Sequence, residues 1–149
     1  MRLRQGSIVA TLIAISVGLP ACTRTSAEEL APPPPASVES IAGSDVARVT
    51  LTSDAARRLD VRTAPVREFG LDGSRPLLVI PYAAVLYDPT GGTWTYTSPQ
   101  PLVFVRVSID VDRILGDEAV LSSGPEPGTE VVIVGTSELW GTENQVGEE

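Results

Sequence analysis

One alternating run constrains the fold of this chain more than any other part of it. From Leu102 to Asp112, aliphatic residues occupy every second position and polar residues occupy most positions between them. A repeat of two is the period of a β-strand with one buried and one solvated face, and branched Cβ atoms suit its pleated surface. We therefore predict a strand with one face toward the core. The predicted inward residues are Val103, Val105, Val107, Ile109 and Val111; the predicted outward residues are Arg106, Ser108, Asp110 and Asp112.

The residues before this run predict a hairpin. The apolar stretch Leu77–Ile80 ends at Pro81, and Tyr82–Tyr87 continues an extended pattern. Residues 88–92 read Asp-Pro-Thr-Gly-Gly, which is a cluster of turn formers. Thr93–Thr97 is the predicted return strand, with its threonines on one face and its aromatic residues on the other.

The residues after the run predict two further strands. Ala119–Leu121 leads into a rigid turn between Gly124 and Gly128, and Val131–Val134 is typical of a buried strand. We expect one of the two glycines that bound the turn to have a positive φ. The turn positions that we expect to shape the fold are Pro81, Gly91, Gly92, Gly124, Gly128 and Gly135.

The folded part begins before these strands, at about Val46. Val49–Leu51 is a predicted short strand, Thr52 or Ser53 is a candidate cap for a brief helix, and Val61–Val66 is extended. Together these patterns predict a mainly β fold, a small antiparallel β-barrel or sandwich with one or two short helices.

The N-terminus has the parts of a secretory leader. Arg2 and Arg4 precede the apolar stretch Ile8–Val17, and small residues follow it. Residues 19–22 read Leu-Pro-Ala-Cys and resemble the lipobox of bacterial lipoproteins, in which the cysteine receives lipid, palmitate included, and becomes the new N-terminus. This resemblance implies that Cys22 anchors the chain to a membrane on its extracytoplasmic side. The alternative is an ordinary secretory leader followed by a chance cysteine.

The chain therefore divides into four predicted segments. Residues 1–21 are the signal peptide, and residues 22–45, which contain Pro32–Pro35, are a disordered tether that begins at the lipidated cysteine. Residues 46–142 form the β domain, and residues 143–149 form an acidic disordered tail.

Composition argues against several classes of function. The chain has no histidine, so it lacks the usual general base near neutral pH and the commonest metal ligand. Its formal net charge is −8, and phosphate groups would repel such a chain, so we expect no nucleic-acid binding. Ser122 and Ser123 have no evident base, and we expect neither an enzyme nor a cofactor. Four carboxylates that we assign to a solvated face rather than to a metal site are Asp110, Asp112, Asp117 and Glu118.

Three aromatic residues are candidates for two roles. Trp94, Tyr96 and Trp140 can anchor an interface, as aromatic residues often do. In a domain with so few aromatic residues, however, such side chains more often belong to the core.

Two stretches together resemble the periplasmic adaptor, or membrane fusion protein, family of RND-type and related efflux systems. The first is Val49–Val66, which is similar to the segment that opens the adaptor body. The second contains Ile-Pro-Tyr-Ala-Ala-Val at 80–85, the Gly91–Gly92 turn, the alternating run and the Gly-Pro-Glu-Pro-Gly turn before a valine strand, and is similar to the family's C-terminal membrane-proximal region. In full adaptors a lipoyl-like domain and a β-barrel domain lie between these stretches, whereas here the glycine-rich residues 68–75 replace them.

The resemblance implies a function and an assembly. This chain is similar to the membrane-proximal domain alone, which adaptors build from both chain ends, so Val61–Val66 is expected to share a sheet with strands of the second half. The implied function is an accessory module of a transport or efflux assembly, with an integral-membrane transporter or a full-length adaptor as partner. The alternative is a stand-alone envelope lipoprotein domain that binds a small ligand or a cell-wall polymer. An envelope hydrolase is a third class, which the lack of catalytic groups disfavours.

Overall fold

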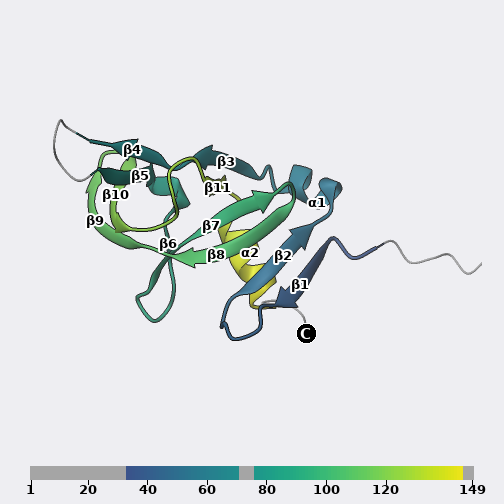
Figure 1. Ribbon diagram of the computed structural model, residues 1–149. Helices are drawn as coiled ribbons and strands as arrows, with labels where there is room; N and C mark the ends of the chain where they lie inside the picture. Colours follow the sequence, from purple (N-terminus) through teal and green to yellow (C-terminus); the bar gives the residue numbers. More distant parts are fainter. Residues whose placement is uncertain (1–32, 71–75, 146–149) are drawn as a thin grey trace, which may run out of the picture. The chain divides into compact units, whose positions relative to one another are not determined.

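The computed structural model describes residues 33–70 and 76–145, which form two antiparallel sheets and two α-helices (Figure 1). The larger sheet, sheet A, has seven strands. In spatial order they are β1 (Ala36–Ser40), β2 (Ala47–Leu51), β8 (Val103–Ser108), β7 (Thr93–Gln100), β11 (Glu130–Val134) and β3 (Arg62–Pro65), with β6 (Leu86–Tyr87) also paired to β7.

The smaller sheet, sheet B, has four strands. They are β4 (Arg67–Phe69), β5 (Leu77–Pro81), β10 (Glu118–Ser123) and β9 (Asp110–Leu115), in that spatial order. The chain crosses from sheet A to sheet B at Val66 and again at Ile109, both of which are buried. The mainly β, sandwich-like prediction is confirmed, whereas the barrel alternative is wrong, because the described strands leave two edges open in each sheet.

Helix α1 (Ser53–Arg58) forms where its capping residues predict it. The Thr52 hydroxyl accepts a hydrogen bond from the Ala55 amide at 3.2 Å, while Asp54 lies in the first turn and two arginines lie in the last. Ala55 packs into the core, so the cap positions the helix against sheet A. The structure thus selects Thr52 from the two candidate caps.

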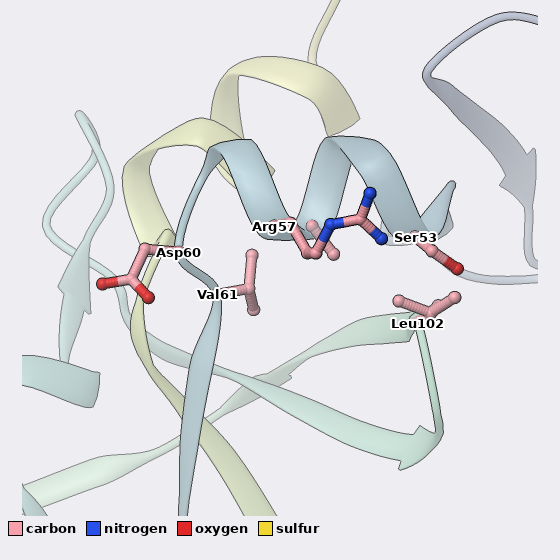
Figure 2. Close-up of a pocket in the computed structure, with 6 residues that line it drawn as sticks. Ser53, Arg57, Asp60, Val61 and Leu102 are labelled. Atoms are coloured by element: carbon pink, nitrogen blue, oxygen red, sulfur yellow. The ribbon is translucent and has the colours of Figure 1, made fainter.

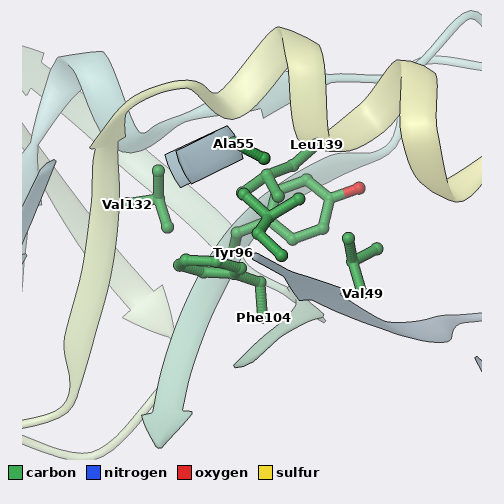
Figure 3. Close-up of a cluster of buried hydrophobic side chains, with 7 residues drawn as sticks. Val49, Ala55, Tyr96, Phe104, Val132 and Leu139 are labelled. Carbon is green, nitrogen blue, oxygen red and sulfur yellow. The ribbon is translucent and has the colours of Figure 1, made fainter. Parts of the chain in front are cut away.

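Two clusters of buried side chains hold the sheets together. The first lies on the face of sheet A that α1 and α2 (Thr136–Glu143) cover, and Figure 3 shows it around the Tyr96 ring. Its buried residues are Val49, Leu51, Ala55, Tyr96, Phe104, Val132 and Leu139. The second joins sheet A to sheet B, and its buried residues are Val66, Ile80, Ala84, Ile109, Ala119, Leu121 and Val131.

The long strand predicted from Val103 to Val111 is two strands. β8 belongs to sheet A and β9 to sheet B, and the Ile109 amide between them donates to the Thr93 carbonyl oxygen at 3.0 Å. The alternation of the sequence continues from β8 into β9, although the chain changes sheets at Ile109, because each of the two strands has its own buried face.

The predicted orientation is correct for β9 and for the exposed Ser108, and wrong for the rest of β8. Asp110 and Asp112 are exposed as expected. In β8, however, Phe104 and Arg106 are buried, and the three valines are only half-buried and belong to neither core cluster. The helices cover the Phe104 side of sheet A, so this larger ring takes the core position opposite Val49.

Both predicted boundaries of the domain are wrong. β1 lies inside the predicted tether, and Ala36 to Ser40 pair along its whole length with β2. Glu143, which lies in the predicted acidic tail, is the last residue of α2, and its side chain is buried. Neither β1 nor the end of α2 has a local apolar pattern that would predict it. Each is ordered instead by a partner elsewhere in the chain.

Two shorter segments also differ from the prediction. Tyr82–Ala84 is a short 3₁₀ helix, η1, rather than extended chain. Arg67–Phe69, which overlaps the start of the predicted connector at residues 68–75, is strand β4 and pairs with β5. Residues 71–75 of that connector lie outside the described residues.

The predicted turns lie where the strands end. Pro81 closes β5, and the Asp88–Gly92 turn joins β6 to β7. Of the two glycines that bound the next turn, Gly128 has the positive φ, 84°, which confirms the expectation that one of them would. Gly135 follows β11 and is the N-cap of α2.

Candidate functional site

A buried ion pair is the most distinctive polar feature of the described residues. Arg106 of β8 and Glu143 of α2 lie 3.2 Å apart, Nε to Oε2, and their side chains are only 7% and 3% exposed. The guanidinium makes three hydrogen bonds to this one carboxylate. A buried charge needs such a partner, because an unpaired one would pay a large desolvation cost.

Two indole rings enclose the guanidinium. The Arg106 Cζ atom lies 4.2 Å from the centre of the Trp94 ring and 4.8 Å from that of the Trp140 ring. Both distances fit cation–π contacts, which strengthen when water is excluded. We call Trp94, Tyr96, Arg106, Trp140 and Glu143 the Arg106 cluster.

The remaining acceptor positions of Glu143 are also used. Its Oε1 accepts the Ala47 amide at 3.0 Å, and its Oε2 accepts the Tyr96 hydroxyl. Burial, together with the neighbouring Glu143 carboxylate, raises the pKa of Tyr96 above its ordinary value of 10.0. The tyrosine therefore stays a neutral donor, and the cluster ties together α2, β2, β7 and β8.

A half-buried aspartate orients one of the two indoles. The Asp88 carboxylate accepts the Trp94 Nε1–H at 2.8 Å, the Thr90 hydroxyl at 2.7 Å, and the Thr90 and Gly92 amides at 2.8 Å each. The Thr90 hydroxyl, followed by the Trp94 indole and the Gly92 amide, lowers the pKa of Asp88 well below its ordinary value of 3.8. The ionised side chain thus fixes both the hairpin turn and the Trp94 ring.

The structure brings all three predicted aromatic anchors into one cluster. Tyr96 is fully buried, so it has the core role that the sequence favours for these residues. Trp94 and Trp140 are half-buried, and for them an interface role stays a prediction. Every acidic oxygen of the cluster has an internal partner, so the arrangement fastens α2 to the sheet and offers no free acid or base.

A separate pocket of about 450 Å³ lies beside α1 (Figure 2). We call it the α1 pocket. Ser53, Ala56, Arg57 and Asp60 line it at helical spacing, with Val61 and Leu102 opposite them. Ala56, Val61 and Leu102 give it a half-buried apolar floor, and the other three residues give it an exposed polar rim.

The other candidate residues lie apart from these features. Asp112 pairs with its neighbour Arg113, and Glu118 pairs with Arg67 across β5. Over residues 33–70 and 76–145, no group of three or more acidic, histidine or cysteine side chains is placed to hold a metal ion. The Ser122 hydroxyl donates to the Asp110 carbonyl oxygen at 3.3 Å.

The predicted anchor cannot be placed. Cys22 lies outside the described residues. In the part of the chain that the structure does describe, no helix has the length and apolar character needed to cross a bilayer.

Sequence reasoning missed the two charged residues of the Arg106 cluster. The alternating pattern predicts Arg106 on the solvated face, and Glu143 falls within the predicted tail. A signal was present in the arginine itself, a single cation within an otherwise apolar strand two residues from Phe104, but nothing local identifies its acidic partner. Comparison of the chain with models of protein families, with curated proteins and with solved structures found no match.

Proposed function

We propose that this chain is a lipid-anchored, extracytoplasmic adaptor-like module that serves as an accessory component of a transmembrane transport or efflux assembly. The proposal starts from the resemblance of Val49–Val66 and of the C-terminal half to the membrane-proximal domain of periplasmic adaptors. Its proposed partner is an integral-membrane transporter or a full-length adaptor. The lipid on Cys22 would hold it at the membrane.

One structural observation carries the proposal, namely that the domain is assembled from both resembling stretches. Strand β2 of the first stretch pairs with β8, where Val49 lies opposite Phe104. Strand β3 of the same stretch pairs with β11, where Ala64 lies opposite Val131. The chain between the stretches passes through β4 and β5, where Phe69 pairs with Leu77. This two-ended assembly is the arrangement that the resemblance implies, so it supports the proposal.

Site-specific photo-crosslinking in membranes of the host tests the partnership. Phe69 and Leu115, on the two edges of sheet B, are 59% and 56% exposed, the most exposed large apolar side chains of the described residues. Each lies on an edge strand, whose unpaired backbone groups can pair with another chain. We expect a photoreactive residue at Phe69 or Leu115 to crosslink to a multi-spanning transporter subunit, and one at the exposed Ser37 of β1 not to do so. Equal or absent crosslinking at all three positions would contradict the proposal.

The anchor has its own test. Cys22→Ser is expected to move the chain from the membrane fraction to the soluble fraction, because lipid attachment is the proposed means of holding it there. Fractionation in high salt checks this. A variant that still sediments with membranes would show that lipid on Cys22 is not the cause.

The α1 pocket favours a second candidate function, a stand-alone envelope lipoprotein domain that binds a small ligand. Its volume falls within the range of small-molecule sites, and it combines an apolar floor with a few polar groups. Ligand binding by the purified chain, with no membrane protein present, would support this candidate.

A further inference from the structure

Two residues with an unfavourable backbone conformation line the α1 pocket. Among the described residues, the non-glycine residues with positive φ are Asp60 at 50°, Leu102 at 66° and Gln145 at 53°. The first two lie in this pocket, although they come from separate parts of the chain. The left-handed region is costly for a residue with a Cβ atom, and such residues often gather at functional sites.

Leu102 is the more unusual of the two. It follows Pro101 in the turn between β7 and β8, at a position where turns with positive φ favour glycine. Its carbonyl oxygen accepts the Leu51 amide at 2.9 Å, a bond that glycine would make equally well. What leucine adds is a side chain, and that side chain lies at the pocket (Figure 2).

Asp60 is unfavourable for a second reason. It follows the C-terminal end of α1, where glycine or asparagine usually adopts this conformation and where the helix dipole disfavours a negative charge. Its carboxylate forms only an exposed pair with Arg62, at 3.3 Å. The conformation of Asp60 closes α1 as a Schellman motif, in which the Asp60 amide donates to the Arg57 carbonyl oxygen at 3.2 Å and the Val61 amide to the Ala56 carbonyl oxygen at 3.0 Å. Local stability explains neither the negative charge of Asp60 at this helix end nor the positive φ of Leu102, and sites where local rules fail are often functional.

The pocket has opposite charges at its two ends. Figure 2 shows the Arg57 guanidinium and the Asp60 carboxylate on opposite sides of Val61. The floor between them is apolar. We propose that the α1 pocket binds a short apolar peptide with free termini, its carboxylate at Arg57, its ammonium at Asp60 and an apolar side chain against Leu102.

The chemistry of the pocket favours this ligand over simpler ones. A fatty acid would bring no ammonium group to Asp60, and a single amino acid carries both charges on one carbon. An extended dipeptide spans roughly 7 Å between its two charged ends, so it can place them on two different side chains of the rim. Arg57 pairs with Asp54 and Asp60 with Arg62, but all four side chains are exposed, so the peptide termini can replace these pairs at small cost.

The inference rests on the second candidate function, a small-ligand domain, and is independent of transporter binding. The test is titration of the purified full chain with the dipeptide Leu-Leu, followed by amide NMR. We expect saturable shifts at residues 53–61 and at Leu102. N-acetyl-Leu-Leu and Leu-Leu-amide are each expected to bind about three- to fivefold more weakly, because one terminal charge is lost.

Variants make the test specific. Arg57→Gln and Asp60→Asn should each weaken Leu-Leu binding about three- to fivefold, whereas Arg58→Gln, an exposed arginine of α1 that does not line the pocket, should leave it unchanged. Leu102→Gly should weaken binding about tenfold and at the same time raise the thermal midpoint, because it removes both the apolar contact and the strain. Leu102→Ala, which keeps the strain, should weaken binding without the gain in stability.

Several results would overturn the proposal. They are absence of saturable shifts at the pocket amides, equal binding of the capped and free dipeptides, equal effects of Arg57→Gln and Arg58→Gln, or wild-type affinity in both Leu102 variants. None of these results bears on the crosslinking to a transporter, so the two proposals fail separately.

Discussion

At the level of single side chains, the Arg106–Glu143 pair is the interaction whose loss should cost the most. Glu143→Ala would leave a buried guanidinium unpaired and the Tyr96 hydroxyl without its acceptor. Breaking a buried pair from one side typically costs about 3–5 kcal/mol of the free energy of unfolding. Urea unfolding of the variant checks this. The control is Glu138→Ala, an exposed carboxylate of the same helix, which should change stability by less than about 0.5 kcal/mol. Equal losses would mean that the pair does not stabilise the fold.

Asp88 predicts a pH dependence with a definite sign. Its pKa is lowered in the folded state, so its contribution to stability is present above the ordinary pKa of 3.8 and is lost as the pH falls below that value. Asp88→Asn should therefore reduce stability at neutral pH, and the difference from the wild type should shrink in acid. Urea midpoints of both proteins between about pH 7 and pH 2 measure this. A difference that is constant over that range would contradict the role of the ionised carboxylate.

Among the elements, α2 carries a residue that does not suit a helix. Gly141 lies inside α2, and a Cβ atom there would meet no atom within 4 Å. Gly141→Ala should therefore stabilise the domain by about 0.5–1 kcal/mol. Gly43→Ala is the matched control, because the same methyl group also meets open space but at a φ of 79°. Thermal unfolding should show opposite changes in the midpoint. A lower midpoint for Gly141→Ala would mean that α2 needs the glycine.

For the whole domain, the two-ended sheet makes the first half indispensable. A chain that starts at Leu77 lacks β2 and β3, so β8 and β11 each lose a neighbour and buried residues such as Phe104 lose cover. We expect it to show no cooperative thermal transition, whereas a chain that starts at Pro33 retains every described element and should melt cooperatively. Calorimetry distinguishes them. Equal midpoints would refute the dependence on both chain ends. A chain that starts at Asp45, next to the predicted domain boundary at residue 46, lacks β1 and would expose the edge of β2.

Local signals in the sequence determined most of the elements. The repeat of two predicts β8 and β9, the Asp-Pro-Thr-Gly-Gly segment predicts the turn before β7, and Thr52 predicts the start of α1. These predictions succeed because the causes lie within a few residues of their effects: backbone sterics, turn chemistry and a capping hydroxyl.

Tertiary structure alone decided which faces are buried and where the domain begins and ends. A repeat of two is satisfied by either face of a strand, so burial of Phe104 and Arg106 depends on the helices that cover that side of sheet A. Arg106 can be buried only because Glu143, 37 residues away, neutralises it there. β1 is likewise a strand because the edge of β2 is available to pair with it. A contact with a distant residue leaves no periodic pattern in the sequence of β1 or in the sequence around Glu143. For that reason only the folded chain reveals these contacts.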